Sequence, residues 1–585
     1  MDSFSPRDIA RIQRRFRRFN STGASDEFTP PQNTPPSVPV VDLQQRLLHN
    51  PQPVRHQTIP EEDGVADIER KFKLMEIKEK IAMVPIPDDV IEMLKQFQVE
   101  HVQNLIYALK KYGVALDASD TGTGKTYAAI AIAAALGLNV IVVCPKSVIP
   151  NWHNVCAEFD VEQSMIVNYE SLKNGKYYVT LGDFLDEVRT NCPYIEFIRD
   201  EILDPMTLEP ILTASGRPKT RVVGIEWSIP NNTLVIFDEA HNSKNGMNNS
   251  IPTINSRMMI MSRPQFDTQR NTFGLCLSAT ITDKLENFDV IGYMLGLFPR
   301  YSKKSYQQFS RKLPNEHAER IQSIHNILYP ARASRMNIRK IKELTGDSQF
   351  KKNDIKAKTY ELDADACDEI EAAHESIRRA MIALRNKQNV DGEHPLTVIL
   401  RQRQRIELLK IPIFVEKIRK HIQRNKSVTV FVNFKETLDT IAQQILTGTD
   451  DWMGMLPDEF DFIRGGQTSD EREEIRKKFQ NDELRLLICN IDASREGISL
   501  HDIHGVYSRR SLISPTWNGI RLKQVFGRGY RANAKSDMVQ RVIYVKSENG
   551  QPAIEQMMCD NMNETLKNIA LLNEGDLQEY ENIGS

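Results

Sequence analysis

Short apolar runs separated by helical patterns occupy two stretches of the chain, about residues 85–300 and 426–546. The runs are Val114–Leu116, Val140–Val143, Leu234–Phe237 and Leu275–Leu277 in the first stretch, and Val428–Val432, Leu484–Ile488 and Val542–Val545 in the second. Such runs between helical segments are typical of strands in a parallel sheet that helices cover. The pattern therefore predicts an α/β fold with two parallel-sheet domains.

The segments outside these two stretches are predicted to be helical or disordered. Helical patterns cover Glu316–Leu328, Asp365–Asn386 and Ile406–Arg424. We therefore divide the chain into a disordered basic and Pro-rich tail (1–60), a helical lead-in (61–87), a first sheet domain (88–300), a helical linker region (301–425), a second sheet domain (426–546), and a C-terminal helix and tail (547–585).

Two segments are candidates for binding a partner. The tail carries six Arg between Arg7 and Arg18, followed by the Pro-rich run Thr29–Pro39. It is either a solvated extended segment or a short basic helix that docks on nucleic acid or on a protein. The interval 173–232 is either a surface insertion or a hairpin that separates strands or binds a partner.

Composition narrows the class of protein. A chain of 585 residues is too long for one core, and its net charge of −2 means that any surface for nucleic acid must be local. The seven Cys include no Cys-x-x-Cys pair, which favours reduced thiols in an intracellular protein over a zinc site. No run of about 18 apolar residues predicts a membrane span, and the Arg-rich N-terminus lacks the apolar segment of a secretory signal.

Residues 118–126, Ala-Ser-Asp-Thr-Gly-Thr-Gly-Lys-Thr, form a predicted phosphate-binding loop between an apolar run and an Ala-rich helical segment that Gly137 can end. Its glycines let backbone N–H groups face a phosphate. Lys125 would reach the β- and γ-phosphates of ATP, and Thr126 would hold Mg²⁺. The strict pattern has Gly at position 119, where this chain has Ser. The predicted nucleotide-binding residues of the loop are Thr121, Gly122, Thr123, Gly124, Lys125 and Thr126.

Two further apolar runs end in polar side chains. The first leads into Asp238-Glu-Ala-His241, where Asp238 would bind Mg²⁺ and Glu239 would orient and deprotonate the attacking water. His241 either couples the nucleotide site to the second domain or is an ordinary polar cap. The second leads into Ser278-Ala-Thr280, whose hydroxyls either hydrogen-bond to the Asp-Glu loop or simply end the strand.

The second domain ends in Gln524-Val-Phe-Gly-Arg528-Gly-Tyr-Arg531. Arg528 and Arg531 lie three residues apart and therefore on one face of a predicted helix. Two guanidinium groups suit a γ-phosphate reached across a cleft, and an Arg finger of this kind is worth ~10³-fold or more in rate. We predict Gln524, Arg528 and Arg531 as catalytic residues together with Lys125 and the Asp-Glu pair.

The order of these motifs over about residues 90–546 resembles that of superfamily 2 helicases and translocases. The resemblance implies two RecA-like domains, and ATP with Mg²⁺ as cofactors. It also implies roles for further residues. Leu94–Val102 resembles the Q motif, in which Gln98 would read the adenine edge. Loops that touch nucleic acid in this superfamily resemble the segments that contain Pro145, Lys146, Ser147, Asn433 and Gly497.

Within the superfamily, the Q motif, the Pro-Lys-Ser segment followed by Trp152, and the Asp-Glu-Ala-His box are most similar to Swi/Snf-type translocases on double-stranded DNA. Three positions depart from that branch: the Ser-Ala-Thr segment, Gly527 where the branch has Asp, and Ser499 where it has Asn. They look more like the helicase-type ATPases of large cytoplasmic DNA viruses. A viral protein of this kind would act in the host cytoplasm or in the virion.

Three functions remain open at this point. The favoured one is an ATP-dependent translocase or helicase on DNA, in viral transcription or replication. An RNA helicase is the second, since its motifs include the same box and Ser-Ala-Thr. The third is the ATPase subunit of a transcription or packaging assembly, docked through the tail or the 173–232 insertion.

Four basic residues form a candidate patch for nucleic acid: Arg401, Arg403, Arg405 and Lys410. The alternative is that they lie on a helix face packed against the acidic stretch before it.

Overall fold

A computed structural model of the chain describes residues 63–180, 187–243, 260–261, 266–281, 288–346, 349–448, 452–493, 498–545 and 554–574. The predicted tail, residues 1–60, lies outside this part. The chain divides into two units, and of the first, residues 1–78, the structure describes only part of helix α2 (Asp63–Ala82). Residues 79–585 form the other unit, and all further elements belong to it.

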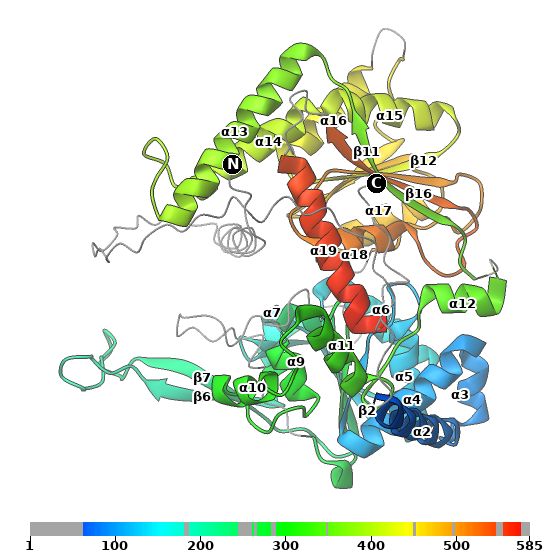
Figure 1. Cartoon of the computed structure of the whole chain (residues 1–585), viewed down its shortest axis with the longest axis vertical. Coiled ribbons are helices and arrows are strands. Elements are labelled where there is room, and N and C mark those ends of the chain that lie inside the picture. Colours follow the sequence, from blue (N-terminus) through cyan, green and yellow to red (C-terminus); the bar gives the residue numbers. More distant parts are fainter. Residues whose placement is uncertain are drawn as a thin grey trace. The chain divides into compact units, whose positions relative to one another are not determined.

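The first sheet has six parallel strands in the order β10-β1-β9-β8-β2-β3 (Figure 1). They are β1 (Val114–Asp117), β2 (Asn139–Cys144), β3 (Gln163–Asn168), β8 (Thr233–Asp238), β9 (Thr272–Leu277) and β10 (Ala333–Ser334). Alternate strand residues face two apolar cores. One core is shared with α3 (Asp88–Met93), α4 (Gln96–Tyr112), α5 (Lys125–Leu136), α6 (Ile149–Glu158) and α12 (Ile338–Thr345), and the other with α7 (Tyr169–Leu172), α9 (Asp289–Met294), α10 (Lys303–Ser310) and α11 (His317–Leu328). Burial of both faces explains why the strands read as continuous apolar runs.

The second sheet also has six parallel strands, in the order β11-β16-β15-β12-β14-β13. They are β11 (Asn353–Tyr360), β12 (Ser427–Val432), β13 (Phe460–Ile463), β14 (Leu486–Asn490), β15 (Arg509–Ile513) and β16 (Met538–Val545). The accompanying helices are α13 (Ala364–Asn386), α14 (Pro395–Leu409), α15 (Ile411–Gln423), α16 (Lys435–Thr447), α17 (Ser469–Gln480), α18 (Gly519–Gly529) and α19 (Ile554–Glu574). The predicted α/β fold with two parallel-sheet domains is confirmed.

The interval 301–425, predicted as a helical linker region, contributes one strand to each sheet. Strand β10 pairs with β1, and β11 pairs with β16 along eight residues, from Asn353 opposite Met538 to Tyr360 opposite Val545. Neither strand has an apolar run. Strand β10 is only two residues long, and β11 is an edge strand with exposed Lys356 and Lys358, as is common at sheet edges. The interval also contains α10 to α15, so it is rich in helices as expected and in addition supplies a strand to each sheet.

The interval 173–232 forms two antiparallel ribbons outside the main sheet. Strand β4 (Lys176–Thr180) pairs with β5 (Glu187–Asn191), and β6 (Ile195–Glu201) pairs with β7 (Thr220–Trp227). The β6–β7 ribbon and the loop that joins its strands extend away from the sheet (Figure 1). In the described part of the chain, no helix combines the length and the apolar character needed to cross a membrane.

Candidate functional site

The register of the first sheet brings three strand ends together. Asp117 of β1 and Asp238 of β8 both lie opposite Leu277 of β9. The phosphate loop, the Glu-Ala-His segment and the Ser-Ala-Thr segment follow these three residues. Because the carboxyl ends of parallel strands meet at one edge, segments that are far apart in the sequence form one site.

Two glycines shape the phosphate loop. Gly122 has φ 88° and Gly124 has φ 93°, in the left-handed region that L side chains rarely adopt. Helix α5 begins directly after them, at Lys125, and ends before Gly137 as predicted. Lys125 and Thr126 therefore lie in the first turn of a helix, where the N–H groups and the dipole favour an anion.

The loop is held by hydrogen bonds to its own main chain. Lys125 Nζ donates to the carbonyl oxygens of Ser119 (3.0 Å) and Asp120 (3.2 Å). Thr123 is buried, and its Oγ1 donates to the Asp120 carbonyl at 2.8 Å. The ammonium group thus lies over the loop that is predicted to cradle phosphates.

Gln98 is buried directly against the loop. Its Nε2 donates to the carbonyl oxygen of Thr123 at 3.2 Å, and its Oε1 accepts from the Lys95 N–H at 2.9 Å. A Cβ on Gly124 would lie 2.5 Å from Gln98 Nε2, so a side chain at this position would force the Gln98 amide to move. Both ends of the Gln98 amide have protein partners, and its contact with adenine stays a prediction.

Ser119, which stands where the usual pattern has glycine, is hydrogen-bonded to the segment that follows strand β10. Its Oγ accepts from the Met336 N–H at 2.9 Å, while the Asp120 N–H donates to the Met336 carbonyl at 3.0 Å. Asp120 Oδ1 accepts from Arg335 Nη2 at 2.9 Å and Oδ2 accepts from the Ile338 N–H at 3.1 Å. The pairing of β1 with β10 thereby continues into the phosphate loop. No motif in the sequence marks Arg335 for this role.

Asp238 and Glu239 lie side by side at the end of β8. Asp238 Oδ2 accepts from the Trp152 indole N–H at 3.1 Å, and its main-chain carbonyl accepts from the Tyr169 hydroxyl at 3.0 Å. Glu239 has φ 52°, a left-handed conformation that is uncommon for Glu. The sequence marked Trp152 as the residue that follows the Pro-Lys-Ser segment, but nothing in it indicated that the indole reaches Asp238.

The two carboxylates differ in ionisation. Burial and the neighbouring charge of Glu239 raise the pKa of Asp238 above its ordinary value. Burial opposes ionisation of Glu239 as well, but His241, Lys125 and Arg528 outweigh it and lower the pKa of Glu239. A pair that repels itself in this way gains from a bound cation.

His241 contacts three of the predicted segments. Its Nδ1 lies 3.1 Å from Glu239 Oε2 and 3.1 Å from Ser278 Oγ, with Thr280 Oγ1 at 3.5 Å. Its Nε2 lies 3.3 Å from the Gln524 amide nitrogen on α18. His241, Ser278, Thr280 and Gln524 are all buried. Both ring nitrogens are used in contacts between segments, which an ordinary polar cap does not require.

Arg528 and Arg531 share one acceptor. Arg528 Nη1 donates to the carbonyl oxygen of Ile498 at 3.2 Å, and Arg531 Nη2 donates to the same oxygen at 3.3 Å. They do not share a helix face, because α18 ends at Gly529. That part of the prediction is wrong: Arg531 lies in the segment after the helix. Burial, together with the charges of Arg528 and Arg476, lowers the pKa of Arg531 to about 9.

The segment around Arg531 packs directly on the phosphate loop. A Cβ on Gly122 would lie 3.2 Å from the Arg531 Cα, and a Cβ on Gly527 would lie 3.0 Å from the Thr121 Cβ. The Ala532 N–H also donates to the Gly122 carbonyl at 3.4 Å. At Gly527, the side chain of an Asp would crowd Thr121, which would have to shift by a few tenths of an ångström.

These residues fit ATP with Mg²⁺. The loop offers helix N–H groups and Lys125, and Arg531 Nε is buried without a hydrogen-bond partner among the described residues. Asp238 and Thr126 supply the oxygen ligands that Mg²⁺ takes beside substrate phosphates. The described residues contain no group of three His, Cys, Asp or Glu placed to hold a metal alone, and a phosphate-bound Mg²⁺ does not need one.

The residues predicted to contact nucleic acid differ in exposure, and one of them lies outside the described part of the chain. Pro145 precedes the short 3₁₀ helix Lys146–Val148 at the end of β2, with Lys146 exposed and Ser147 half-buried. Lys146 is therefore open to a phosphate backbone. Gly497 lies outside the described residues. The roles of these residues stay predictions.

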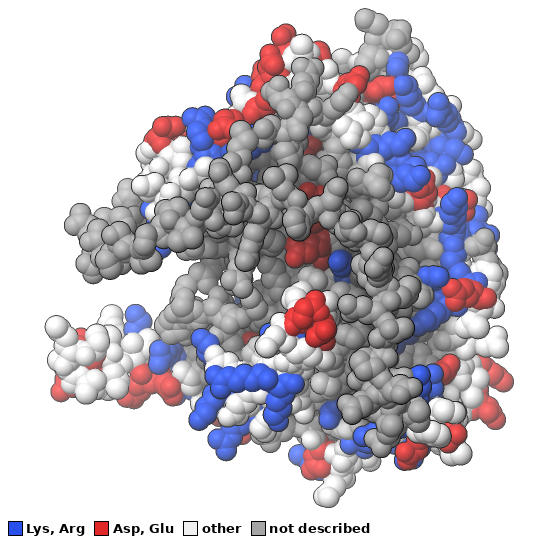
Figure 2. Space-filling model, in the orientation of Figure 1, with Lys and Arg blue, Asp and Glu red and all other residues white. Residues whose placement is uncertain are grey.

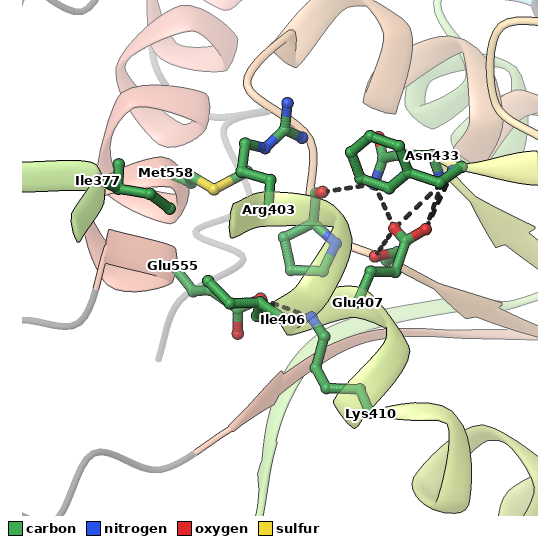
Figure 3. A pocket seen from close by; sticks show the side chains of 11 residues that line it. Ile377, Arg403, Ile406, Glu407, Lys410, Asn433, Glu555 and Met558 are labelled. Atoms are coloured by element: carbon green, nitrogen blue, oxygen red, sulfur yellow. Dashed lines mark hydrogen bonds and ion pairs between the residues drawn. The ribbon is translucent and has the colours of Figure 1, made fainter. Parts of the chain in front are cut away.

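Asn433, at the end of β12, lies in a closed polar network (Figure 3). Its Nδ2 donates to Glu407 Oε2 at 2.7 Å and to the Pro515 carbonyl at 3.0 Å. Glu407 also accepts from the Asn433 and Phe434 N–H groups and from Ser514 Oγ. Both hydrogens of the Asn433 amide are used within the protein, and its contact with nucleic acid stays a prediction.

The basic patch predicted on α14 is wrong as a single surface. Lys410 is 1% exposed and its Nζ lies 2.5 Å from Glu555 Oε1 (Figure 3). Arg405 pairs with Glu369 of α13, and Arg401 pairs with Glu393, each at 3.0 Å. The alternative, packing against the preceding acidic stretch, describes Arg405. Arg403 instead lies beside the rings of Phe434 and Trp517.

Comparison with known proteins identifies the two sheet domains. Residues 91–283 match the family described as "Type III restriction enzyme, res subunit", and residues 408–533 match the "Helicase conserved C-terminal domain". The chain is 33% identical over 498 residues to a putative ATP-dependent RNA helicase of Acanthamoeba polyphaga mimivirus, covering 83% of this chain and 84% of that protein. The Sulfolobus solfataricus SWI2/SNF2 ATPase core in complex with dsDNA aligns with 77% of this chain and 88% of its own, at 16% identity and a TM-score of 0.30. A superposition this weak carries no argument.

The match to the viral protein spans most of both chains, and the two family matches cover the segments that hold the phosphate loop, the Asp-Glu pair and Arg528. The chain therefore belongs to the superfamily 2 helicases and is an ATP-hydrolysing enzyme related to a viral member of that family.

Proposed function

We propose that the protein is a translocase that moves along DNA by coupling ATP hydrolysis to motion between its two sheet domains. The observation that carries this proposal is the position of His241, which contacts Glu239, Ser278 and Gln524. One imidazole joins the predicted catalytic carboxylate to a helix of the second sheet domain. A change in the position or charge of Glu239 during hydrolysis would therefore alter the contact between His241 and α18.

The roles of the residues in this proposal follow from their places. Lys125 and the loop N–H groups bind the phosphates, while Thr126 and Asp238 hold Mg²⁺, which when bound neutralises phosphate charge. Glu239 orients the attacking water, and it stays ionised because cations surround it. Arg528 and Arg531 supply positive charge from the second domain, where charge develops on the transferred group.

The choice of DNA rests on sequence. The Q motif, the Pro-Lys-Ser segment and the Asp-Glu-Ala-His box are most similar to the Swi/Snf branch. The mimivirus relative is described as a putative RNA helicase, which makes RNA the competing track. Exposed Lys146 would hold a phosphate of either polymer, and backbone contacts of this kind give salt-sensitive binding without sequence preference.

Steady-state ATPase rates with no polymer, single-stranded DNA, duplex DNA and single-stranded RNA test the proposal, with Lys125→Ala as the blank. We expect the largest stimulation from duplex DNA. Stimulation by single-stranded DNA alone would indicate a strand-tracking motor. Stimulation by RNA alone would overturn the choice of track, and a flat response above the blank would indicate an ATPase that a partner activates.

One observation favours a role as a subunit of an assembly. The β6–β7 ribbon ends in a loop with exposed apolar side chains, of which Met206 is 94% and Leu208 72% exposed. Asp204 Oδ1 accepts from the Met206 and Thr207 N–H groups and so fixes the turn, and Leu208 has φ 59°. A bulky residue in this region is an outlier, so the turn presents its side chains in a set conformation.

The charge of this loop argues for a protein partner. Residues 200–216, at the tip of the ribbon, contain Asp200, Glu201, Asp204 and Glu209 but no Lys or Arg, whereas Arg217 and Lys219 follow them in the same loop. The ribbon tip is white and red in Figure 2. Carboxylates repel a phosphate backbone, whereas exposed apolar patches mark protein contacts. We therefore propose that the ribbon docks on an apolar protein surface with a basic rim, and that it does not separate strands.

The double variant Met206→Ser/Leu208→Asn tests this role, because Asn tolerates the left-handed conformation. We expect unchanged ATPase and unwinding rates, and loss of a co-purifying protein that the unaltered chain retains. Loss of unwinding with normal ATPase would instead assign strand separation to the ribbon.

A further inference from the structure

Helix α19 is anchored at both ends by buried ion pairs. In its first turn, Glu555 pairs with Lys410, and its other oxygen accepts from the Val545 N–H at 3.3 Å. These partners belong to the second sheet domain. At its last residue, Glu574 pairs with Arg335, which follows strand β10 of the first sheet. The helix packs against α18 near one end and α11 near the other.

The last turn of α19 also contacts two segments of the nucleotide site's own domain. Asn573 Nδ2 donates to the carbonyl oxygen of Ala279, the central residue of the Ser-Ala-Thr segment, at 3.2 Å. The Leu572 carbonyl lies 3.0 Å from His325 Nδ1. The end of α19 is therefore docked beside the site and not free in solvent.

Arg335 connects this helix end to the phosphate loop. Its Nε lies 2.6 Å from Glu574 Oε1, an ion pair whose geometry is not that of a hydrogen bond, and its Nη2 donates to Asp120 Oδ1 at 2.9 Å. The side chains of Arg335 and Glu574 are each 7% exposed. Arg335 therefore lies between two carboxylates, and removing Glu574 would take away one of them and leave Asp120 as a partner.

Asp120 is a residue of the loop itself. Its carbonyl oxygen accepts from Lys125 Nζ and from Thr123 Oγ1, while its carboxylate is held by Arg335 and the Ile338 N–H. Burial opposes ionisation of Asp120, but Arg335 and Lys523 outweigh it and lower its pKa. A movement of Arg335 would therefore shift the main chain on which Lys125 rests.

We infer that Arg335 is a positioning residue for the phosphate loop and that the chain Glu574–Arg335–Asp120 couples nucleotide binding to the docking of helix α19. When α19 is docked, Glu574 holds the guanidinium against Asp120. When the helix end leaves, Arg335 loses that charge partner and the loop loses its support. By linkage, a nucleotide that needs the ordered loop stabilises the docked helix to the same degree.

The test compares Glu574→Gln with Lys340→Gln in the full chain. Lys340 contacts the same carboxylate at 3.4 Å, but it is 70% exposed and does not touch Asp120. We expect Glu574→Gln to raise the KM for ATP about tenfold with a smaller change in kcat, a size within the usual range of coupling between sites. Lys340→Gln should leave both parameters unchanged.

Two further measurements separate positioning from damage to the fold. Hydrogen exchange of residues 565–574 should slow on addition of a non-hydrolysable ATP analogue in the unaltered chain and in Lys340→Gln, but not in Glu574→Gln. A double-mutant cycle of Asp120→Asn with Glu574→Gln should be non-additive in the KM for ATP. Arg335→Lys, which keeps the charge but loses the planar fork, should fold and raise the KM.

Additive effects of the two substitutions on the KM, or hydrogen exchange in α19 that does not change when nucleotide is added, would overturn this inference. Neither result would contradict the ATPase activity.

Discussion

Strands β8 and β12 occupy the same place in the strand order of their two sheets. A carboxylate lies at or beside the end of each strand, Asp238 at β8 and Glu407 at β12, and the two have different surroundings. Glu407, beside β12, accepts hydrogen bonds on both oxygens from two main-chain N–H groups, an amide and a hydroxyl. Asp238, at the end of β8, accepts from the Trp152 indole and the Glu239 N–H, and it lies against a second carboxylate. The carboxylate of Glu407 is surrounded by hydrogen-bond donors, whereas burial and the charge of Glu239 raise the pKa of Asp238.

The difference separates a structural carboxylate from one that can bind a cation. Satisfying both oxygens makes a buried anion part of the scaffold, because no acceptor is left for a ligand. Burying two adjacent carboxylates that repel each other makes a bound cation favourable. The same fold therefore supplies a closed loop anchor in one domain and the predicted Mg²⁺ site in the other.

The largest expected effect is at the phosphate loop. Lys125→Ala should abolish ATP turnover, because the carbonyls of the loop hold the Lys125 ammonium group where it can reach a phosphate. The chain should still fold, since the hydrogen bonds that Lys125 makes are to main-chain carbonyls of its own loop. Steady-state ATPase and circular dichroism measure the two. Normal turnover would remove the nucleotide site from this edge of the sheet.

Arg528→Ala should lower kcat about 10³-fold with little change in the KM for ATP, because an Arg finger acts on charge that develops in the transition state. Arg405→Ala is the matched control, since its ion pair with Glu369 is exposed, and it should be silent. Equal losses in kcat and in affinity would instead indicate simple binding.

Glu407→Gln tests the structural side of the comparison. It brings an amide hydrogen against donors in a buried site, and should cost about 2–3 kcal/mol in the free energy of unfolding. ATPase without polymer should persist in the folded fraction. Denaturant titration gives the first quantity. A loss below about 0.5 kcal/mol would mean that the network in Figure 3 contributes little.

The smallest expected effect is at His241. His241→Ala should keep basal ATPase within about threefold but reduce polymer stimulation about tenfold. The substitution removes the imidazole that joins Glu239 to Gln524, while the predicted ligands of Mg²⁺ remain. Rates with and without duplex DNA measure it. Full stimulation in the variant would make His241 a cap and not a coupling residue.

Sequence predicted the parts of the fold and site that local pattern encodes. Apolar runs marked β1, β2, β8, β9, β12, β14 and β16, and glycines at positions that need positive φ marked the phosphate loop. The strands without apolar runs were missed: β10 is too short, and β15 contains Arg509, which is buried against Asp482.

Contacts that depend on tertiary packing could not be predicted. Arg335 and Glu407 belong to no motif, and Trp152 belongs to one that does not indicate its contact with Asp238. Each acquires its role only when a distant segment packs against it. Helix α18 looked long enough to carry both arginines, but Gly529 ends it before Arg531. The Arg-rich face of α14 read as a patch because its carboxylate partners on α13 and α19 lie elsewhere in the sequence.

The pairing of β11 with β16 has a consequence for biosynthesis. The first sheet gains its last strand, β10, soon after the ribosome has passed the residues of the nucleotide site. In the second sheet, strand β11 cannot pair until its partner β16 has been synthesised. Glu574 follows later still, so a nascent chain holds a complete phosphate loop long before the carboxylate that steadies it emerges. During that interval the newly made first domain would bind nucleotide weakly, and the motor would gain full affinity only when its final helix docks.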